Sequence, residues 1–141
     1  MIIVDTNVLS EWLRNDADPN VVGWYTAQSA TDVYVTTISE AEMWFGANRL
    51  PHGRKRAALS SSIAALFDSA FADRRLAFDS SAARGLADMV AERGLHLKLI
   101  DLFDAQIAAI ALAHSATLAT RNTKHFSIYG VDLIDPWQTV R

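Results

Sequence analysis

The chain has 141 residues, no cysteine, and 13 basic against 16 acidic side chains, which gives a net charge of −3. The lack of cysteine excludes disulfides, thiolate catalysis and zinc–thiolate sites, and a slightly acidic protein has no long-range attraction for nucleic acid. A chain of this length buries roughly two thirds of its unfolded surface, enough for one domain over residues 1–141. No apolar run approaches membrane-spanning length and the first residues lack a basic start, so we expect a cytoplasmic protein without membrane contact.

The first ten residues place an acid at the end of a buried strand. Residues 2–4 form a β-branched run without polar alternation, which predicts a strand covered on both faces in a parallel sheet. Asp5 follows directly, and Thr6 and Asn7 then offer N-cap side chains for a helix. Open α/β sheets bind ligands at the carboxyl ends of their strands, and a carboxylate near a core requires a positive partner or a metal. Asp5 is therefore a candidate functional residue.

The middle of the chain alternates helices with short strands. We expect strands over residues 32–37, 74–78 and 131–134, and helices over residues 19–28, 40–50, 54–71 and from Ser80 or Ser81 to Gly94. Ser39 is expected to cap the helix that starts at Glu40, with Glu42 completing a capping box. Helical periodicity does not decide whether Glu40 or Glu42 points inward. The alternation predicts a parallel α/β sandwich.

An alanine-rich helix over residues 101–115 carries the second candidate acid. Asp101 is expected to be its N-cap, which is a structural role. Asp104 shares a helical stripe with apolar residues three, four and seven positions further on, so it is expected to face the core. A first-turn acid is common at a helix start, but one on the buried stripe is less so. Asp104 is therefore a second functional candidate.

The strand predicted over residues 117–120 also ends in polar side chains. Arg121, Asn122 and Lys124 lie directly after it. Asn122 thereby occupies the same kind of position as Asp5, at the carboxyl end of a buried strand.

These side chains would form a metal site if they converge. Two carboxylates about 4 Å apart repel by roughly 4 kcal/mol at an effective dielectric constant of about 20, and a divalent cation reverses the sign. An all-oxygen set without cysteine or clustered histidine selects Mg²⁺ or Mn²⁺ rather than zinc. Such ions activate an attacking water and neutralise charge on the leaving group, so the implied reaction is phosphodiester hydrolysis.

Four motifs occur in the order and spacing of a known family. They are Ile-Val-Asp-Thr-Asn-Val-Leu at 3–9, Thr-Ile-Ser-Glu-Ala-Glu-Met-Trp-Phe-Gly at 37–46, Asp-Ala-Gln-Ile-Ala-Ala at 104–109 and Ala-Thr-Arg-Asn-Thr-Lys-His-Phe at 119–126. On these motifs the chain resembles the PIN-domain ribonucleases, and within them the VapC-type toxins of type II toxin–antitoxin systems, including the FitB-like branch. The resemblance implies a single α/β PIN domain, a three-layer sandwich with a short central parallel sheet and helices on both faces.

The resemblance also implies roles for the candidate residues. The conserved glutamate of the family lies four residues before a glycine, which selects Glu42, and the same matching makes Asp5 and Asp104 the other metal-binding acids. Asn122 departs from the pattern, because many members carry aspartate there, so it is expected to be a weaker fourth ligand. The implied protein is a metal-dependent endoribonuclease toxin, with these four catalytic residues and one firmly bound Mg²⁺ or Mn²⁺.

Further residues and partners follow from the same resemblance. Thr6, Asn7 and Thr120 are expected to orient the acids. Arg121 and Lys124 are expected to contact RNA phosphates. The expected partners are the RNA substrate, a second copy of the chain in a homodimer, and a cognate VapB-type antitoxin that silences the enzyme by inserting a side chain into the acidic site. Operator DNA is expected to bind only through the antitoxin.

Two alternatives stay open. One takes Asp5 as the nucleophile of a haloacid-dehalogenase-like phosphatase, although such enzymes need an acid at the position of Asn7. The other is a catalytically weak PIN-fold binding partner in a complex of antitoxin and operator DNA, which the change at Asn122 favours. His125 is isolated in the sequence and Trp137 is expected in the core, so neither receives a functional role.

Overall fold

The computed structural model describes residues 1–138 and contains a five-stranded sheet in the order β3-β2-β1-β4-β5. Its strands are β1 (Ile2–Val4), β2 (Val33–Thr36), β3 (Arg75–Leu76), β4 (Thr117–Ala119) and β5 (Leu133–Ile134). All neighbouring strands are parallel, and Ile2 of β1 pairs with Val33 on one side and with Thr117 on the other. β1 is therefore the central strand, and the predicted parallel α/β architecture is confirmed.

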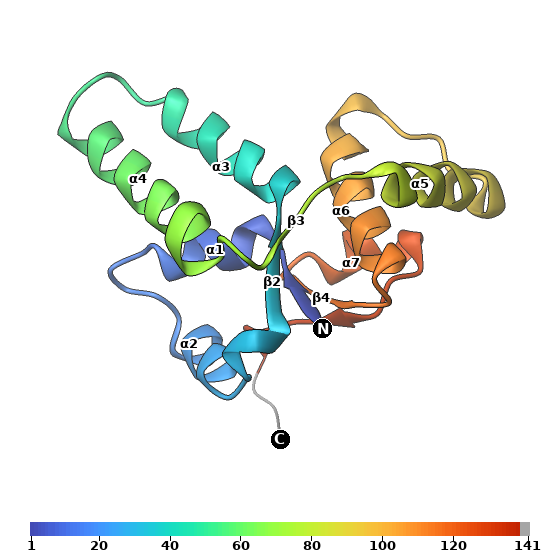
Figure 1. The fold of residues 1–141 in the computed structure, drawn as a ribbon, viewed down its shortest axis with the longest axis horizontal. Helices are drawn as coiled ribbons and strands as arrows, with labels where there is room; N and C mark the ends of the chain where they lie inside the picture. The colour runs from blue at the N-terminus through green and yellow to red at the C-terminus, as the bar shows by residue number, and fades with distance from the viewer. Residues whose placement is uncertain (139–141) are drawn as a thin grey trace.

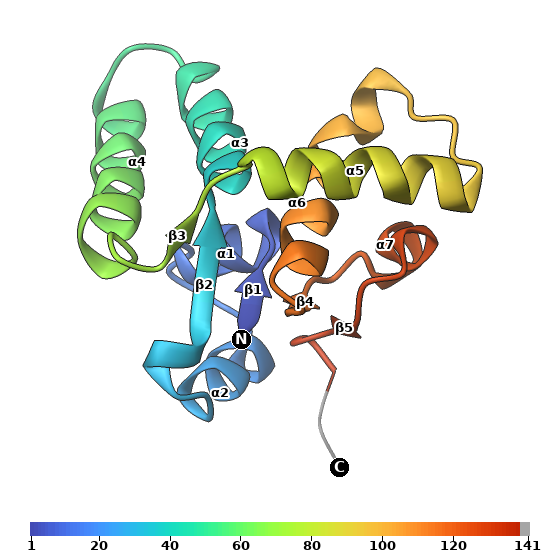
Figure 2. The same cartoon turned by 45° about the vertical axis from the view of Figure 1, so that its right-hand side comes forward.

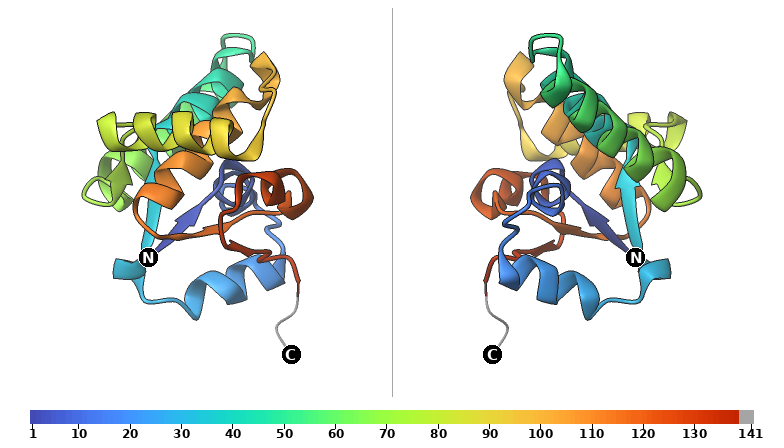
Figure 3. Two further views of the ribbon diagram at one scale, coloured as in Figure 1. Left: turned by 90° about the vertical axis from the view of Figure 1, so that its right-hand side faces the viewer. Right: turned by 90° about the vertical axis from the view of Figure 1, so that its left-hand side faces the viewer.

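Helices cover both faces of this sheet (Figures 1 and 3). One face carries α1 (Thr6–Trp12), α2 (Pro19–Thr26), α3 (Thr37–Asn48) and α4 (Arg54–Ala65), and the other carries α5 (Ser80–Arg93), α6 (Leu102–Ala113) and α7 (Thr123–Phe126). The α-helix predicted over residues 54–71 is shorter than expected, because α4 passes into a π-helical turn at Leu66–Ala70. No helix within residues 1–138 has both the length and the apolar composition that crossing a membrane requires.

The central strand sends alternate side chains into two separate cores. Ile3 packs in the core beneath α5 and α6, whereas Val4 packs in the core beneath α1 and α3, and both are fully buried. Successive side chains of a strand point to opposite faces, so a strand enclosed on both faces needs an apolar residue at every position. This explains the uninterrupted β-branched run, and it leaves Asp5 as the first residue beyond the two cores.

Small side chains fix the position of α6. Ala105, Ala108, Ala109 and Ala111 are fully buried where the helix packs against α5 and the sheet. Methyl-sized side chains allow a close approach of the helix backbone, and the interior around them is close-packed. The position of Asp104, in the first turn of α6, therefore depends on this alanine face.

Two helices start differently from the prediction. Asp5 itself is the N-cap of α1, and its side chain accepts the Thr6 N–H at 2.7 Å. Thr36 caps α3, where its hydroxyl accepts the Ser39 N–H at 3.1 Å, so the expected capping box of Ser39 and Glu42 is wrong. In both cases the strand passes into the helix without a loop, and the last extended residue serves as the cap. Glu42 is thereby left in the middle of α3 without a capping role.

The close packing of α6 predicts that Ala108→Leu destabilises the protein. Three added carbon atoms have no space against the sheet, so the free energy of unfolding should fall by about 1–3 kcal/mol in urea titrations followed by circular dichroism. Ala113→Leu is the matched control, since Ala113 is exposed on the same helix and its substitution should change the free energy by no more than about 0.5 kcal/mol. Equal stability of the two variants would contradict the packing described for α6.

Candidate active site

The carboxyl ends of β1 and β4 form the edge at which the candidate residues gather. The chain leaves β1 for β2 on one side, while β4 pairs with β1 on the other side, so this edge is a topological switch point. Open α/β sheets bind their ligands at such points. Asp5 follows β1, and Thr120 and Asn122 follow β4. Figure 2 shows β1 and β2 side by side, both directed toward α3.

Three carboxylates from distant parts of the chain converge at this edge. Asp5, Glu42 and Asp104 each present one carboxylate oxygen, and these oxygens lie within 4.8 Å of one another. Asp5 is buried, with 4 % of its surface exposed, and the other two acids are partly buried. All three line a cleft of about 580 Å³, to which Asn122 also contributes. The structure thus brings together the four residues that were singled out as metal ligands.

Hydrogen bonds hold both oxygens of Asp5. Its Oδ1 accepts the Thr6 N–H at 2.7 Å, and its Oδ2 accepts the Thr120 hydroxyl at 2.8 Å. Asn7 contacts Thr120 rather than an acid, since its Nδ2 donates to the Thr120 hydroxyl oxygen at 3.4 Å and its Oδ1 accepts the Arg121 N–H at 3.3 Å. Thr6 and Thr120 therefore contact Asp5 directly, and Asn7 reaches it through Thr120.

The structure distinguishes the two glutamates of α3. Glu42 Oε1 accepts the Thr6 hydroxyl at 2.9 Å, and that hydroxyl also lies 3.0 Å from Ser39 Oγ. Glu40 instead pairs with Arg75 at 3.4 Å and is not among the residues that line the cleft. Glu42 is therefore the glutamate of the acidic cluster, and Thr6 connects it to the first helix.

His125 contacts Asp104, which the sequence analysis did not anticipate. Its Nε2 lies 2.9 Å from Asp104 Oδ2 and 3.6 Å from Asp101 Oδ1. Asp101 precedes α6 as expected, but its side chain makes no capping hydrogen bond. The contact depends on the short helix α7, which carries His125 three residues beyond Asn122. The available signal was Asn122 itself, since asparagine is a common helix N-cap.

Burial raises the pKa values of the clustered acids. The pKa of Asp5 rises from 3.8 to about 6, chiefly because burial disfavours the charged form, while its two hydrogen bonds act in the opposite direction. Burial also raises the pKa of Glu42 from 4.5 to about 7, with a further contribution from the charges of Asp5 and Asp104. The pKa of Asp104 is raised by burial against the opposing charge of His125. Ionising all three acids together therefore requires a compensating positive charge.

Basic and aromatic side chains extend the cleft beyond the acids. Arg121 lines it, with its guanidinium carbon 5.2 Å from the centre of the Trp137 ring. Trp137 packs against the core beneath α1 to α4, as expected, but it also lines the cleft. Arg14 is a further lining residue and pairs with Asp16 at 3.2 Å. Lys124 is exposed on α7 and is not among the lining residues.

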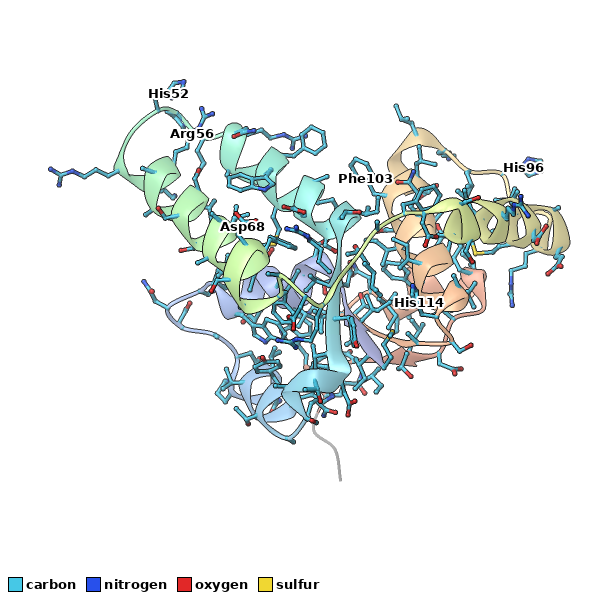
Figure 4. All side chains as sticks on the ribbon, in the orientation of Figure 1. His52, Arg56, Asp68, His96, Phe103 and His114 are labelled. Carbon is cyan, nitrogen blue, oxygen red and sulfur yellow. The ribbon has the colours of Figure 1, made fainter. Side chains whose placement is uncertain are left out.

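The other histidines lie far from one another. His52, His96 and His114 belong to three separate parts of the molecule (Figure 4). Within residues 1–138, the group of acidic or histidine side chains that is close enough to hold a metal ion consists of Asp5, Glu42 and Asp104.

Known proteins match this chain over its full length. A model of the PIN domain matches residues 2–131. The VapC ribonuclease Y4jK of Sinorhizobium fredii is 38 % identical over 138 residues, which cover 98 % of this chain and 99 % of that protein. The toxin FitB of Neisseria gonorrhoeae is 37 % identical over 137 residues, which cover 97 % of this chain and 99 % of that protein.

A solved structure supports the same assignment. A chain in the structure of FitAB bound to an IR36 DNA fragment has a TM-score of 0.88 and 37 % sequence identity, with coverage of 100 % of this chain and 99 % of that one. Asp5, Glu42 and Asp104 all lie within the residues that the PIN model matches. The resemblance carried by the four motifs is thereby confirmed, and the chain belongs to the PIN-domain family, within the VapC-type ribonuclease toxins of toxin–antitoxin systems.

Proposed function

We propose that this protein is a metal-dependent endoribonuclease toxin that cleaves RNA phosphodiester bonds. The observation that carries the proposal is the convergence of Asp5, Glu42 and Asp104 from three distant segments to within 4.8 Å, at the switch point of the sheet. Membership of a ribonuclease family adds independent support.

The donor set fits a hard divalent cation. Buried carboxylates whose oxygens lie within 4.8 Å of one another repel, and their raised pKa values reflect the cost of ionising them without a partner. Asp5, Glu42 and Asp104 would hold Mg²⁺ or Mn²⁺, and the amide oxygen of Asn122 would be a weaker fourth ligand. A bound ion of this kind supplies an activated water and neutralises charge on the leaving group.

The neighbouring residues orient the acids and the substrate in this proposal. Thr6 and Thr120 fix Asp5 through hydrogen bonds to both of its oxygens. His125 donates its ring N–H to Asp104 and so restrains that carboxylate, the kind of contact that supports metal affinity. Arg121 in the cleft wall and Lys124 on α7 would contact RNA phosphates on either side of Asn122.

The proposed partners are a cognate VapB-type antitoxin, a second copy of the chain, and operator DNA bound through the antitoxin, all in the cytoplasm. FitAB, which contains a chain of this fold at 37 % identity, was solved with bound DNA. Phe45 of α3 and Phe103 of α6 are 54 % and 37 % exposed, and their rings lie 6.0 Å apart. Exposed paired aromatics of this kind favour a protein contact.

A catalytically weak binding partner remains the second candidate function. The amide of Asn122 favours it, because an amide lacks the negative charge that a fourth acid would bring to the cluster. The two candidates differ in one measurable property, which is metal-dependent RNA cleavage by the purified protein.

Removing one acid at a time should abolish cleavage. We expect Asp5→Asn, Glu42→Gln and Asp104→Asn each to lower the rate of RNA cleavage in Mn²⁺ by at least about 100-fold, because each loses a metal ligand. The rate is measured on a fluorescently labelled RNA, and circular dichroism checks the fold.

Glu40→Gln is the matched control for Glu42→Gln. It makes the same chemical change on the same helix but removes only the contact to Arg75, so it should keep cleavage within about threefold of the native rate. Full cleavage by the folded Asp5→Asn variant would overturn the nuclease proposal.

The raised pKa values predict how the stability of the metal-free protein depends on pH. Since Asp5 binds a proton more tightly in the folded state, with a pKa of about 6 against an ordinary value of 3.8, its contribution to the free energy of unfolding falls as pH rises through this range. The full loss, from below pH 3.8 to well above pH 6, should be about 3 kcal/mol, of which about 1.4 kcal/mol falls between pH 5 and pH 8. Thermal unfolding in EDTA at pH 5 and pH 8 measures it.

Two comparisons isolate this effect from other titrating groups. Asp5→Asn should lose less stability than the native protein between pH 5 and pH 8, because asparagine does not titrate. Mn²⁺ should raise the melting temperature of the native protein at pH 8 and leave that of Asp5→Asn nearly unchanged. An equal difference in melting temperature between the native protein and Asp5→Asn at pH 5 and at pH 8 would contradict the shift.

A further inference from the structure

The cleft is larger than a metal site requires. Its volume of about 580 Å³ is that of a small-molecule site, and its lining includes Arg121 and Trp137 as well as the acidic cluster. The three acids among the lining residues can account for the ion and the scissile phosphate. The other lining residues, which include Arg121 and Trp137, could therefore bind a second part of the substrate.

Arg121 and Trp137 are each fixed through their backbones. The Arg121 N–H donates to Asn7 Oδ1 at 3.3 Å. The Trp137 N–H donates to Asp135 Oδ1 at 2.9 Å, and its carbonyl accepts the Asn20 side-chain amide at 3.0 Å. The backbone at Trp137 is thus anchored to the start of α2, and its side chain packs against the core on that face of the sheet. The contact between the two side chains therefore rests on backbone positions that are fixed on both sides.

No acidic side chain within the part of the chain that the structure describes neutralises the charge of Arg121. Within residues 1–138, its guanidinium forms no salt bridge and lies over the indole of Trp137, 5.2 Å from the ring centre. Guanidinium planes and aromatic rings are the two side-chain surfaces on which proteins stack unpaired bases, and a cation held on an indole keeps its N–H edges available for phosphate.

We propose that Arg121, supported by the Trp137 ring beneath its guanidinium, forms a base-stacking subsite, which binds an unpaired nucleotide of RNA next to the scissile phosphate. This inference rests on the proposed nuclease function and names the residues that bind an unpaired base beside the scissile phosphate. Bases within a duplex are already stacked on one another and cannot occupy the subsite. Stacking has little sequence preference, so the subsite distinguishes single-stranded from double-stranded RNA rather than one base from another.

The test measures binding separately from cleavage. A fluorescein-labelled single-stranded RNA of eight nucleotides is titrated with the full chain in EDTA, and the fluorescence anisotropy gives the dissociation constant. Trp137→Ala should weaken binding about tenfold, and Trp137→Phe should restore it to within about threefold, because a ring again supports the Arg121 guanidinium. Arg121→Lys should weaken RNA binding to a similar extent as Trp137→Ala, since lysine keeps the charge but lacks the planar surface.

An abasic scan separates stacking from a structural role of Trp137. Removing the base that occupies the subsite should weaken binding to the native protein about tenfold and should leave binding to Trp137→Ala unchanged, because that variant has already lost the contact. Trp24→Phe is the matched control, since Trp24 lies outside the cleft lining, and it should respond to the abasic RNA as the native protein does. The same RNA annealed to its complement should bind the native protein at least tenfold more weakly.

The outcomes distinguish this proposal from the nuclease function. Unchanged RNA binding by Trp137→Ala, or equal losses from the abasic site in the native protein and in Trp137→Ala, would overturn the subsite even if the native protein cleaves RNA. Conversely, binding that depends on Trp137 in a native protein that cleaves no RNA in Mn²⁺ would support the subsite while overturning the nuclease proposal. In the cleaving enzyme, Trp137→Ala should raise KM about tenfold with little change in kcat.

Discussion

Repulsion among three carboxylates is the constraint on which the site depends. Asp5 is nearly inaccessible to solvent, and Glu42 and Asp104 present oxygens within 4.8 Å of it and of each other. The protein offsets part of this cost with donors at Asp5, where Thr6 and Thr120 occupy both oxygens. The remainder appears as raised pKa values for all three acids. Such a cluster is at its lowest free energy with protons or a cation bound, which is a binding function built into the fold.

The fold creates this cluster by ending elements at one edge of the sheet. β1 runs between two apolar cores, and Asp5 follows it where both cores end. The carboxylate of Asp5 also caps α1. α3 follows β2 without a loop, and the alanine face of α6 brings Asp104 close to the sheet. The site is therefore held by the packing of three helices rather than by flexible loops.

Local patterns predicted the strands, the longer helices and two of the acids, because strand ends and buried helical stripes are set by nearby residues, but they missed the short helix α7. They could not choose between Glu40 and Glu42, which depends on what each meets across the fold, and only the family resemblance selected Glu42. The predicted capping box of Ser39 and Glu42 is wrong for a related reason, since Thr36, the last residue of β2, is the N-cap of α3. The partners of His125 and of Trp137 were missed because these contacts depend on how distant segments pack.

The most direct test of the account is crystallography of the native protein soaked in Mn²⁺, with anomalous diffraction data that locate the ion. We expect one strong anomalous peak coordinated by carboxylate oxygens of Asp5, Glu42 and Asp104, and a weaker contact or a water on the side of Asn122. A crystal at pH 8 with millimolar Mn²⁺ and no anomalous peak among these three acids would contradict the claim that a divalent cation relieves their repulsion.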